Sequence, residues 1–402
     1  MAIITAIPSN IVSSPHRIVF KGGKFYNAKN NSFERKDVEV IDGKIGRTER
    51  DIPTNEKGTV VKKLSGNSFV GPGWIDLHAH FFGCWGEGMD TIQDEVFLGV
   101  TTSVDAGSAG PKNIEDFIQG ALSDADGYLL AMLNIAPGGL ANRTGENKEL
   151  TWHSAIETAE KAIKYRDKIK MIKIRIGKTQ NTSGTRRPAL LMAKEAAELA
   201  GLPLMVHIED GVKLREIMEI LRPGDIITHA FRKDGDCCLL DSKNRLKPYV
   251  VDFLAKGGRL DIGHGAGGFH KETVEAGIAQ LKLLENQNYE PLSTSTDLHC
   301  FSVNGPVYDL PTTIAKMISL GMTREDAIRS VTRTPAEALG LPASRWRMHK
   351  GDPANLTIWE QEVSDHKVHR FIDPHKTVWK GREMLKPTIV FANGQLIEIG
   401  KI

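Results

Sequence analysis

The stretch that decides the fold is Gly71-Pro72-Gly73-Trp74-Ile75-Asp76-Leu77-His78-Ala79-His80. It predicts an apolar strand that ends in two histidines, and residues two apart on a strand point to the same side. His78 and His80 can therefore hold one metal ion together, and imidazole nitrogens suit zinc-like ions. The competing interpretation is that two histidines fall by chance at the end of a core strand, so the rest of the chain has to decide.

Composition places the chain among ordinary globular proteins. Its 402 residues are 40% hydrophobic and 25% charged, enough for one large domain and a smaller one. Lys and Arg number 52 against 50 Asp and Glu, a formal net charge of +2, so we expect no nucleic-acid partner. Residues 1–17 lack a signal-peptide core, and no later run is long and apolar enough to span a membrane. We expect a cytoplasmic protein with no membrane partner.

Both ends of the chain predict short strands. Apolar runs such as Ile18-Val19-Phe20 and Val38-Glu39-Val40-Ile41 alternate with turns before residue 70. Near the other end, Thr388-Ile389-Val390-Phe391 precedes the turn Asn393-Gly394. These runs are too short and polar for a buried parallel sheet. We therefore expect residues 1–70 and 350–402 to pair into one small β-sandwich domain.

Between these ends, apolar strands alternate with helical segments, which predicts a parallel sheet built from βα units. Helical periods with one apolar face occur, for example, at 187–200 and 273–284. After the histidine strand we expect seven further strands, at 101–106, 128–135, 171–176, 204–208, 226–230, 260–263 and 293–298. Eight such units fit a (β/α)8 TIM barrel over residues 71–349 better than an open doubly wound sheet.

Side chains suited to metal binding or acid–base chemistry stand at the ends of several of these strands. Lys173 and Arg175 share one face of the fourth strand. His207 and His229 lie at the ends of the fifth and sixth strands, and Asp297 lies near the end of the eighth. Active sites of (β/α)8 barrels form at the carboxyl ends of the strands. A lone histidine there is commonplace, whereas an ordered set predicts a shared site.

The order of these residues resembles the amidohydrolase superfamily of metal-dependent hydrolases. That order is His-x-His on the first strand, Lys on the fourth, His on the fifth and sixth, and Asp on the eighth. The resemblance spans nearly the whole chain, because Gly71-Pro72-Gly73, Val331 to Ala336 and Gly351 to Leu356 also look like segments of that superfamily. It implies a (β/α)8 barrel, a composite β domain and hydrolysis at a metal centre.

The resemblance also implies two divalent metal ions, with zinc as the expected metal, and six ligands. These would be His78, His80, Lys173, His207, His229 and Asp297. The first-strand histidines would share one ion with Asp297, and the other two histidines would hold the second. Lys173 would bridge both ions once carbon dioxide has carboxylated its N6; a salt-bridged or snorkelling lysine is the competing interpretation. Asp297 would be the general base for the attacking hydroxide and then the general acid for the leaving group.

Substrate choice depends on fewer residues. Dihydroorotases usually carry an arginine two residues after the His-x-His pair, where this chain has Phe82. Arg175 and the segment Asp261-Ile262-Gly263-His264-Gly265 look more like deacetylases of O-acetylated α-hydroxy acids such as acetyl-mandelate. We expect a small-molecule ester or amide whose carboxylate binds Arg175 and whose carbonyl or acid group contacts His264. A structural ion pair at Arg175 and an ordinary loop histidine at His264 are the alternatives.

Other functions remain open. A cyclic amidohydrolase of the dihydroorotase type would use the same metal ligands. A deaminase is less favoured because many deaminases use one metal and lack a lysine at the position of Lys173. A non-catalytic relative would be expected to have lost ligands. The glycines of 263–268 also match a dinucleotide fingerprint, but they follow the seventh strand rather than the first of a Rossmann unit. Because barrel enzymes often associate, we also expect a homo-oligomer.

Overall fold

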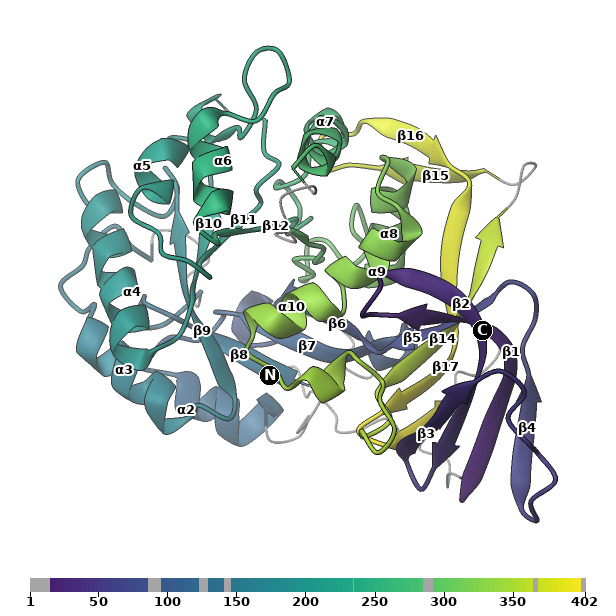
Figure 1. Ribbon diagram of the computed structural model, residues 1–402. Helices are drawn as coiled ribbons and strands as arrows, with labels where there is room; N and C mark the ends of the chain where they lie inside the picture. The colour runs from purple at the N-terminus through teal and green to yellow at the C-terminus, as the bar shows by residue number, and fades with distance from the viewer. Residues whose placement is uncertain are drawn as a thin grey trace.

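The computed structural model of the chain describes residues 15–85, 95–122, 129–140, 146–233, 235–284, 292–363 and 368–398. Two bodies lie side by side (Figure 1): a parallel sheet surrounded by helices, and a mainly antiparallel sheet built from both ends of the chain. This architecture confirms the predicted fold class, a (β/α)8 barrel with a small β domain. The residue limits of the two parts, near 70 and 350, stay predictions.

The parallel sheet has eight strands in chain order, each paired with its sequence neighbours. They are β6 (Trp74–Ala79), β7 (Val100–Ala106), β8 (Leu129–Asn134), β9 (Ile169–Ile176), β10 (Leu204–Ile208), β11 (Ile226–Thr228), β12 (Arg259–Asp261) and β13 (Leu292–Ser293). An isolated parallel bridge from Ala79 to Leu298 joins the first unit to the eighth, so the sheet curls into a nearly closed barrel. The strands are apolar and almost wholly buried because helices cover their outer faces.

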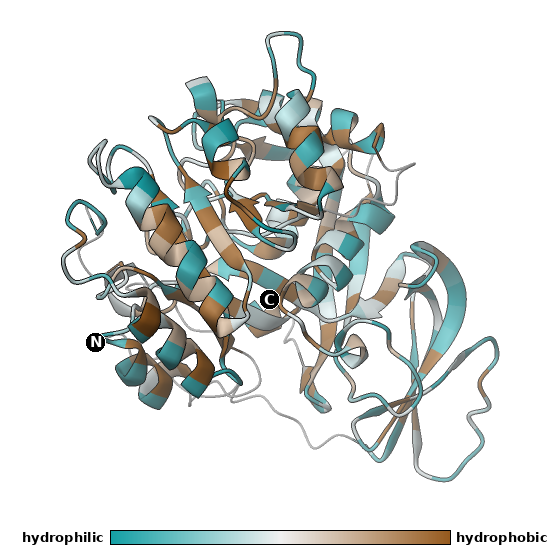
Figure 2. Cartoon of the chain, turned by 60° about the vertical axis from the view of Figure 1, so that its left-hand side comes forward, coloured by the Kyte–Doolittle hydropathy of each residue, from teal (hydrophilic) through white to brown (hydrophobic). Residues whose placement is uncertain are grey.

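Helices surround this barrel with their apolar faces inward, as the brown and teal sides of the helices in Figure 2 show. They are α2 (Ile114–Phe117), α3 (Ala155–Lys164), α4 (Arg186–Ala200), α5 (Leu214–Met218), α6 (Pro248–Ala255), α7 (Lys271–Lys282), α8 (Leu310–Ser319), α9 (Arg324–Ser330) and α10 (Arg333–Ala338). A π-helical turn lies at Ile118–Leu122, and 3-10 turns lie at Gly83–Trp85, Gly235–Cys237 and Ala343–Arg345.

Helix α4 shows where the apolar pattern is ambiguous. Its buried face consists mainly of small residues, including Ala193, Ala196 and Ala197, so the helix can lie close to the sheet. Leu191 and Leu199, which the sequence pattern also assigns to an apolar face, are 43% and 52% exposed. In this helix alanine, and not leucine, marks most of the inner surface.

The β domain has one large sheet whose strands come from both chain ends. They are β1 (Arg17–Asn27), β2 (Ser32–Ile41), β3 (Lys44–Glu49), β4 (Thr59–Lys63), β5 (Ser68–Pro72), β14 (Leu356–Val363), β17 (Glu383–Ala392) and β18 (Gln395–Glu398). The ends meet where β5 pairs antiparallel with β14. At this junction Trp359 is buried, and the centroid of its ring lies 5.5 Å from the ring centroids of Phe69 and Trp74. Aromatic packing therefore ties the β domain to the first barrel strand.

A separate hairpin, β15 (His369–Ile372) and β16 (Val378–Gly381), lies beside α7 and α8 (Figure 1). The indole Nε1 of Trp379 donates a hydrogen bond of 2.9 Å to Ser319 Oγ at the end of α8. The same indole ring stacks on Phe269, with centroids 6.3 Å apart. The hairpin thus helps to cover the segment that follows β12.

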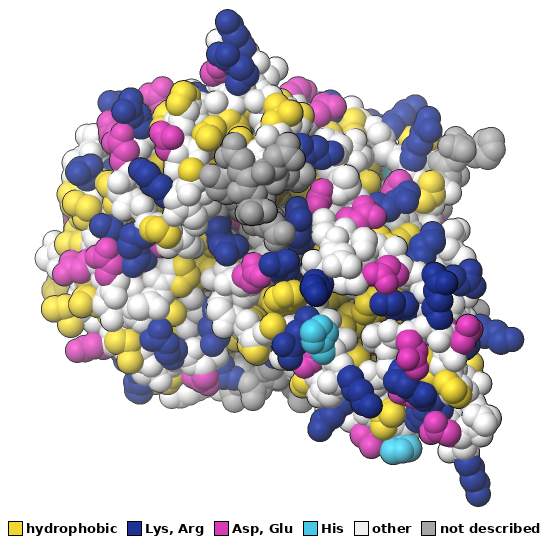
Figure 3. Space-filling view, viewed as in Figure 1, with side chains coloured by type: hydrophobic (Ala, Val, Ile, Leu, Met, Phe, Trp, Pro, Cys, Tyr) yellow, Lys and Arg dark blue, Asp and Glu magenta, His cyan; other side chains and the backbone are white. Residues whose placement is uncertain are grey.

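The surface carries both signs of charge. Figure 3 shows Lys and Arg side chains interspersed with Asp and Glu over the face it presents, in keeping with the balanced composition. Among the described residues, no helix combines the length and the apolar character that crossing a bilayer requires.

Candidate active site

The two histidines of the opening motif lie at the carboxyl end of the first barrel strand and face one carboxylate. His78 is in β6 and His80 follows its end, and both side chains are buried. Oδ1 of Asp297 lies 3.2 Å from His78 Nε2 and 3.1 Å from His80 Nε2. Two histidines at the end of one strand and an aspartate distant in the sequence therefore direct ligand atoms to one point.

His229 approaches the same carboxylate from β11. Its Nε2 lies 3.8 Å from Asp297 Oδ2 and is buried without a hydrogen-bond partner. The ligand atoms of His78, His229 and Asp297 all lie within 4.8 Å of one another. His207 lies near the end of β10, and the centroid of its ring is 4.2 Å from that of His229. A buried ring nitrogen without a hydrogen-bond partner, close to a carboxylate, is suited to bind a metal ion.

Lys173 lies in β9 with its side chain fully buried. Its Nζ is 3.2 Å from His78 Nε2 and 3.4 Å from Met205 Sδ. Among the described residues, no carboxylate comes within the 4.0 Å of an ion pair, and a buried amine does not snorkel to solvent. Burial lowers the pKa of Lys173 to about 7. Both competing interpretations of this lysine therefore conflict with its surroundings.

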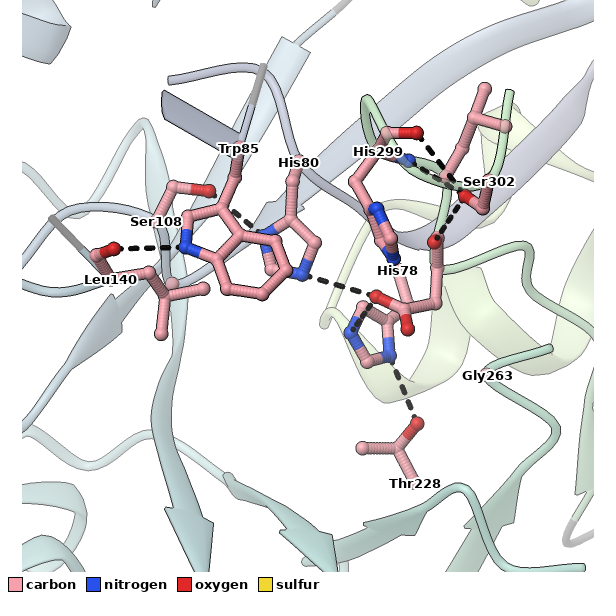
Figure 4. A network of polar contacts seen from close by, with 12 residues as sticks. His78, His80, Trp85, Ser108, Leu140, Thr228, Gly263, His299 and Ser302 are labelled. Atoms are coloured by element: carbon pink, nitrogen blue, oxygen red, sulfur yellow. Dashed lines mark hydrogen bonds and ion pairs between the residues drawn. The ribbon is translucent and has the colours of Figure 1, made fainter. Parts of the chain in front are cut away.

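Each histidine beside Asp297 fixes its second ring nitrogen on a protein group, as Figure 4 shows for two of them. The Nδ1 contacts are His78 to Thr228 Oγ1 at 2.9 Å, His80 to Ser108 Oγ at 2.8 Å and His229 to the carbonyl of Gly263 at 2.6 Å. Such contacts orient imidazole ligands and leave Nε2 available to a metal. Burial also lowers the pKa values of His80 and His229 to about 3, which keeps both rings neutral.

Behind His78 a chain of hydrogen bonds sets the position of the ring proton. Thr228 donates to Asp261 Oδ2 at 2.7 Å, so its hydroxyl oxygen accepts the proton on His78 Nδ1. Asp261 is fully buried and also accepts hydrogen bonds from Ser293 and Ser295. Thr228 was not among the site residues predicted from the sequence. A threonine directly before a histidine at a strand end was the available signal.

Two of the proposed ligands have left-handed backbone conformations. The φ angle is 57° at His229 and 49° at Asp297, a region that residues other than glycine rarely adopt. Regular strand pairing ends before each of them, because β11 stops at Thr228 and β13 at Ser293. The predicted strands at 226–230 and 293–298 are therefore shorter in the structure. Such conformations occur preferentially at functional sites.

Arg175 and His264, the predicted substrate contacts, are each held by a partner within the protein. Arg175 binds Glu146 through two contacts, Nε to Oε1 at 2.6 Å and Nη2 to Oε2 at 3.1 Å, so the ion-pair alternative is present. Nε2 of His264 lies 2.9 Å from Nζ of Lys316. The structure thus gathers the six predicted ligands into one group and gives these two residues partners of their own.

Aromatic side chains that the sequence analysis missed border this group. The Trp85 ring lies 5.7 Å from the His80 ring, and its Nε1 donates to the carbonyl of Leu140 (Figure 4). The ring of Phe301 lies 6.2 Å from that of Trp85 and is 52% exposed. The guanidinium of Arg175 lies 5.3 Å from the centre of the Trp85 ring. A partly apolar wall with a cation at its edge thus stands next to His80.

The donor set suits a divalent metal ion. Neutral imidazoles, one carboxylate and a buried amine converge at the carboxyl ends of parallel strands, where barrel enzymes place their chemistry. A metal bound there would polarise a carbonyl and make hydroxide available near neutral pH. The arrangement can therefore support hydrolysis without a nucleophilic side chain.

Comparison with known proteins agrees with this chemistry. A sequence profile of the amidohydrolase family matches residues 69–397. A deacetylase of Agrobacterium fabrum is 34% identical over 305 residues, which cover 74% of this chain and 72% of that protein. Crystal structures of a dihydroorotase (28% identity, TM-score 0.81) and an adenine deaminase (26% identity, TM-score 0.82) each match 95% of this chain and 99% of their own. The chain therefore belongs to the amidohydrolase family and is a hydrolase of ester or carbon–nitrogen bonds.

Proposed function

We propose that this hydrolase is a binuclear zinc enzyme that removes an acyl group, best represented by acetyl, from a small carboxylate-bearing ester or amide. The observation that carries the proposal is the convergence of His78, His80 and His229 on Asp297, with Lys173 buried alongside. The similarity to a deacetylase over 74% of the chain supports the choice of acetyl as the acyl group.

In this proposal the six ligands divide between two ions. His78, His80 and Asp297 would hold one, while His207 and His229 would hold the other. Lys173, once carboxylated at N6, would supply an anionic bridge, and its burial beside His78 without a carboxylate partner among the described residues supports this. When bound, the ions would activate water and polarise the scissile carbonyl. Asp297 takes a proton from the attacking water on its carboxylate and returns it to the leaving oxygen or nitrogen.

The substrate would lie against Trp85 and Phe301, next to the histidines. A carboxylate on the substrate would reach Arg175, whose guanidinium already faces Trp85. Glu146 occupies two donors of that guanidinium, so the substrate carboxylate would have to share Arg175 with it. This competition predicts modest affinity for the carboxylate rather than tight anion binding.

The decisive experiment combines metal analysis of protein purified without chelators with hydrolysis assays on acetyl-mandelate, N-acetyl amino acids and dihydroorotate. About two zinc ions per chain together with turnover of the acetylated acids is the expected result. His229→Asn should lose metal and activity, whereas His349→Asn, at an exposed histidine, should keep both. Wild-type protein that binds no metal and turns over none of these compounds would overturn the proposal.

A cyclic amidohydrolase is the second candidate, because a dihydroorotase structure matches 95% of the chain. The position where dihydroorotases usually carry an arginine holds Phe82, whose ring packs 4.7 Å from that of Phe117. An apolar contact there offers nothing to a substrate carboxylate, which favours the deacetylase. Turnover of dihydroorotate in the same assay would reverse this order. The cytoplasmic location and the homo-oligomer stay predictions.

A further inference from the structure

Lys316 is a buried lysine that no predicted role accounts for. It lies on α8 with its side chain fully buried. Its Nζ is 2.9 Å from His264 Nε2 and 2.5 Å from the carbonyl oxygen of Pro306. Among the described residues, no carboxylate lies within ion-pair distance of this amine. Because burying a lysine without a paired charge is costly, its two polar contacts call for an explanation.

The contacts of the His264 ring determine which of its nitrogens carries the proton. Nδ1 of His264 lies 3.1 Å from the carbonyl oxygen of Gly265, which can only accept, so the ring proton lies on Nδ1. Nε2 therefore accepts the hydrogen bond from Nζ of Lys316. The imidazole also stacks on Phe269, with centroids 4.3 Å apart. Both ring nitrogens of His264 are therefore engaged within the protein.

The segment anchored by His264 holds two proposed metal ligands. The carbonyl of Gly263 accepts the hydrogen bond from His229 Nδ1 at 2.6 Å. Gly265 packs so closely on Asp297 that a Cβ at this position would lie 2.2 Å from Oδ2. Its amide donates to the carbonyl of Thr296, directly before the aspartate. A shift of the 263–265 segment would therefore displace both ligands.

The second contact reaches Asp297 from the other side. Pro306 belongs to the segment that follows the aspartate, in which the carbonyl of Ser302 accepts hydrogen bonds from the amides of Gly305 and Tyr308. The hydroxyl of Ser302 donates to the carbonyl of Asp297 at 3.3 Å. Lys316 thus joins the two segments that flank Asp297.

We propose that Lys316 is a positioning residue: by holding His264 and Pro306 together it fixes His229 and Asp297 in the geometry that metal binding and proton transfer require. The inference rests on the proposed function and gives His264 a role behind the ligands instead of one against the substrate. It differs from simple core stabilisation because it links Lys316 to metal affinity and to kcat.

The test replaces Lys316 with methionine, which keeps the length of the side chain and removes its donors. Zinc affinity of metal-free protein is measured by competition with a chromogenic chelator, and kcat and KM are measured on the best acetylated substrate. Lys316→Met should weaken zinc binding about tenfold and lower kcat by a similar factor, as expected when an outer partner of a ligand is lost. KM should stay near the wild-type value. Thr313→Val, one turn earlier on the same helix, is the matched control and should change neither quantity.

The double variant Lys316→Met/His264→Phe separates positioning from stability. It leaves an apolar pair with the stacking on Phe269 intact, so the thermal midpoint should recover towards that of the wild type. Zinc affinity and kcat should stay low, because the donated hydrogen bond is still absent. Wild-type zinc affinity in either variant would overturn the proposal, as would a loss that Thr313→Val reproduces. A rise in KM with unchanged kcat would do so too, by making His264 a substrate contact. The measurement of zinc affinity uses no substrate, so it tests the role of Lys316 even if the proposed deacetylation is wrong.

Discussion

Replacing Thr228 with valine tests whether the hydrogen bonds behind the histidines control metal binding. The two side chains have nearly the same shape, and Thr228 is fully buried, so the change removes a hydroxyl with little repacking. That hydroxyl is 2.9 Å from His78 Nδ1 and 2.7 Å from Asp261 Oδ2. Its loss removes the acceptor of the ring proton on His78.

The expected loss of zinc affinity follows from the hydrogen bonds that Asp261 and His78 keep in the variant. Asp261 retains hydrogen bonds from Ser293 at 2.7 Å and from Ser295 at 2.8 Å, so its own loss is small. A buried donor left without an acceptor costs about 1–3 kcal/mol. His78 Nδ1 lies only 3.6 Å from Asp261 Oδ2. A slight turn of the ring would let Nδ1 donate to this carboxylate and recover part of the lost free energy. We therefore expect a loss of zinc affinity at the lower end of the range for removing the hydrogen-bond partner of a metal ligand. This is about tenfold, or about 1.4 kcal/mol.

Chelator competition on metal-free protein measures this directly. Thr228→Ser, which keeps the hydroxyl, is the matched control and should retain wild-type affinity. The reasoning is refuted if Thr228→Val binds zinc as tightly as the wild type while remaining folded. The same result would mean that Asp261 alone orients His78.

Three further predictions concern the proposed bridging residue Lys173, the junction between the β domain and the barrel at Trp359, and the loss of folding stability at low pH. Lys173→Ala should abolish most hydrolysis and reduce bound zinc, as measured by metal analysis; retention of both at wild-type levels would rule out the bridging role. Trp359→Ala should lower the free energy of unfolding by about 3–5 kcal/mol in urea titrations, because a large buried side chain is removed at the junction; a loss below 1 kcal/mol, at about the level of an average surface change, would contradict this. Hydrogen bonds from Arg47, and then from Arg17, outweigh burial and lower the pKa of Glu39 from 4.5 to about 2. A depressed pKa stabilises the folded state above pH 4.5, and this contribution is lost as the pH falls towards 2. Glu39→Gln should therefore lower the thermal midpoint at pH 7 more than at pH 3, and an equal loss at both would refute the assignment.

Periodicity and order along the chain were enough to predict the barrel. The fifth strand, Leu204–Ile208, has the same limits in the structure as in the sequence pattern. Strand-end position also placed Lys173 and the histidines near one another, because the carboxyl ends of parallel strands meet at one edge. These features depend on local spacing, which the sequence carries openly.

Other features depend on contacts across the fold. Arg175 lies 29 residues from Glu146, and His264 lies 52 residues from Lys316, so neither partner can be read from local patterns. Strand β13 ends at Ser293 and the chain is left-handed at Asp297, whereas the sequence predicted one strand from Ser293 to Leu298. Polar partners of ring nitrogens are likewise set by three-dimensional neighbours.

The pairing of β5 with β14 has a consequence for synthesis on the ribosome. Strand β5 ends at Pro72 and leads directly into β6, yet its partner begins at Leu356, after all the barrel strands in the sequence. Until then, the nascent chain carries every barrel strand beside a β5 edge that still lacks this neighbour, and open edges invite pairing with other chains. A chain that stops before β14 would thus have all six proposed ligands but would be prone to aggregate. The solubility of the barrel half thus depends on a strand that is made after it.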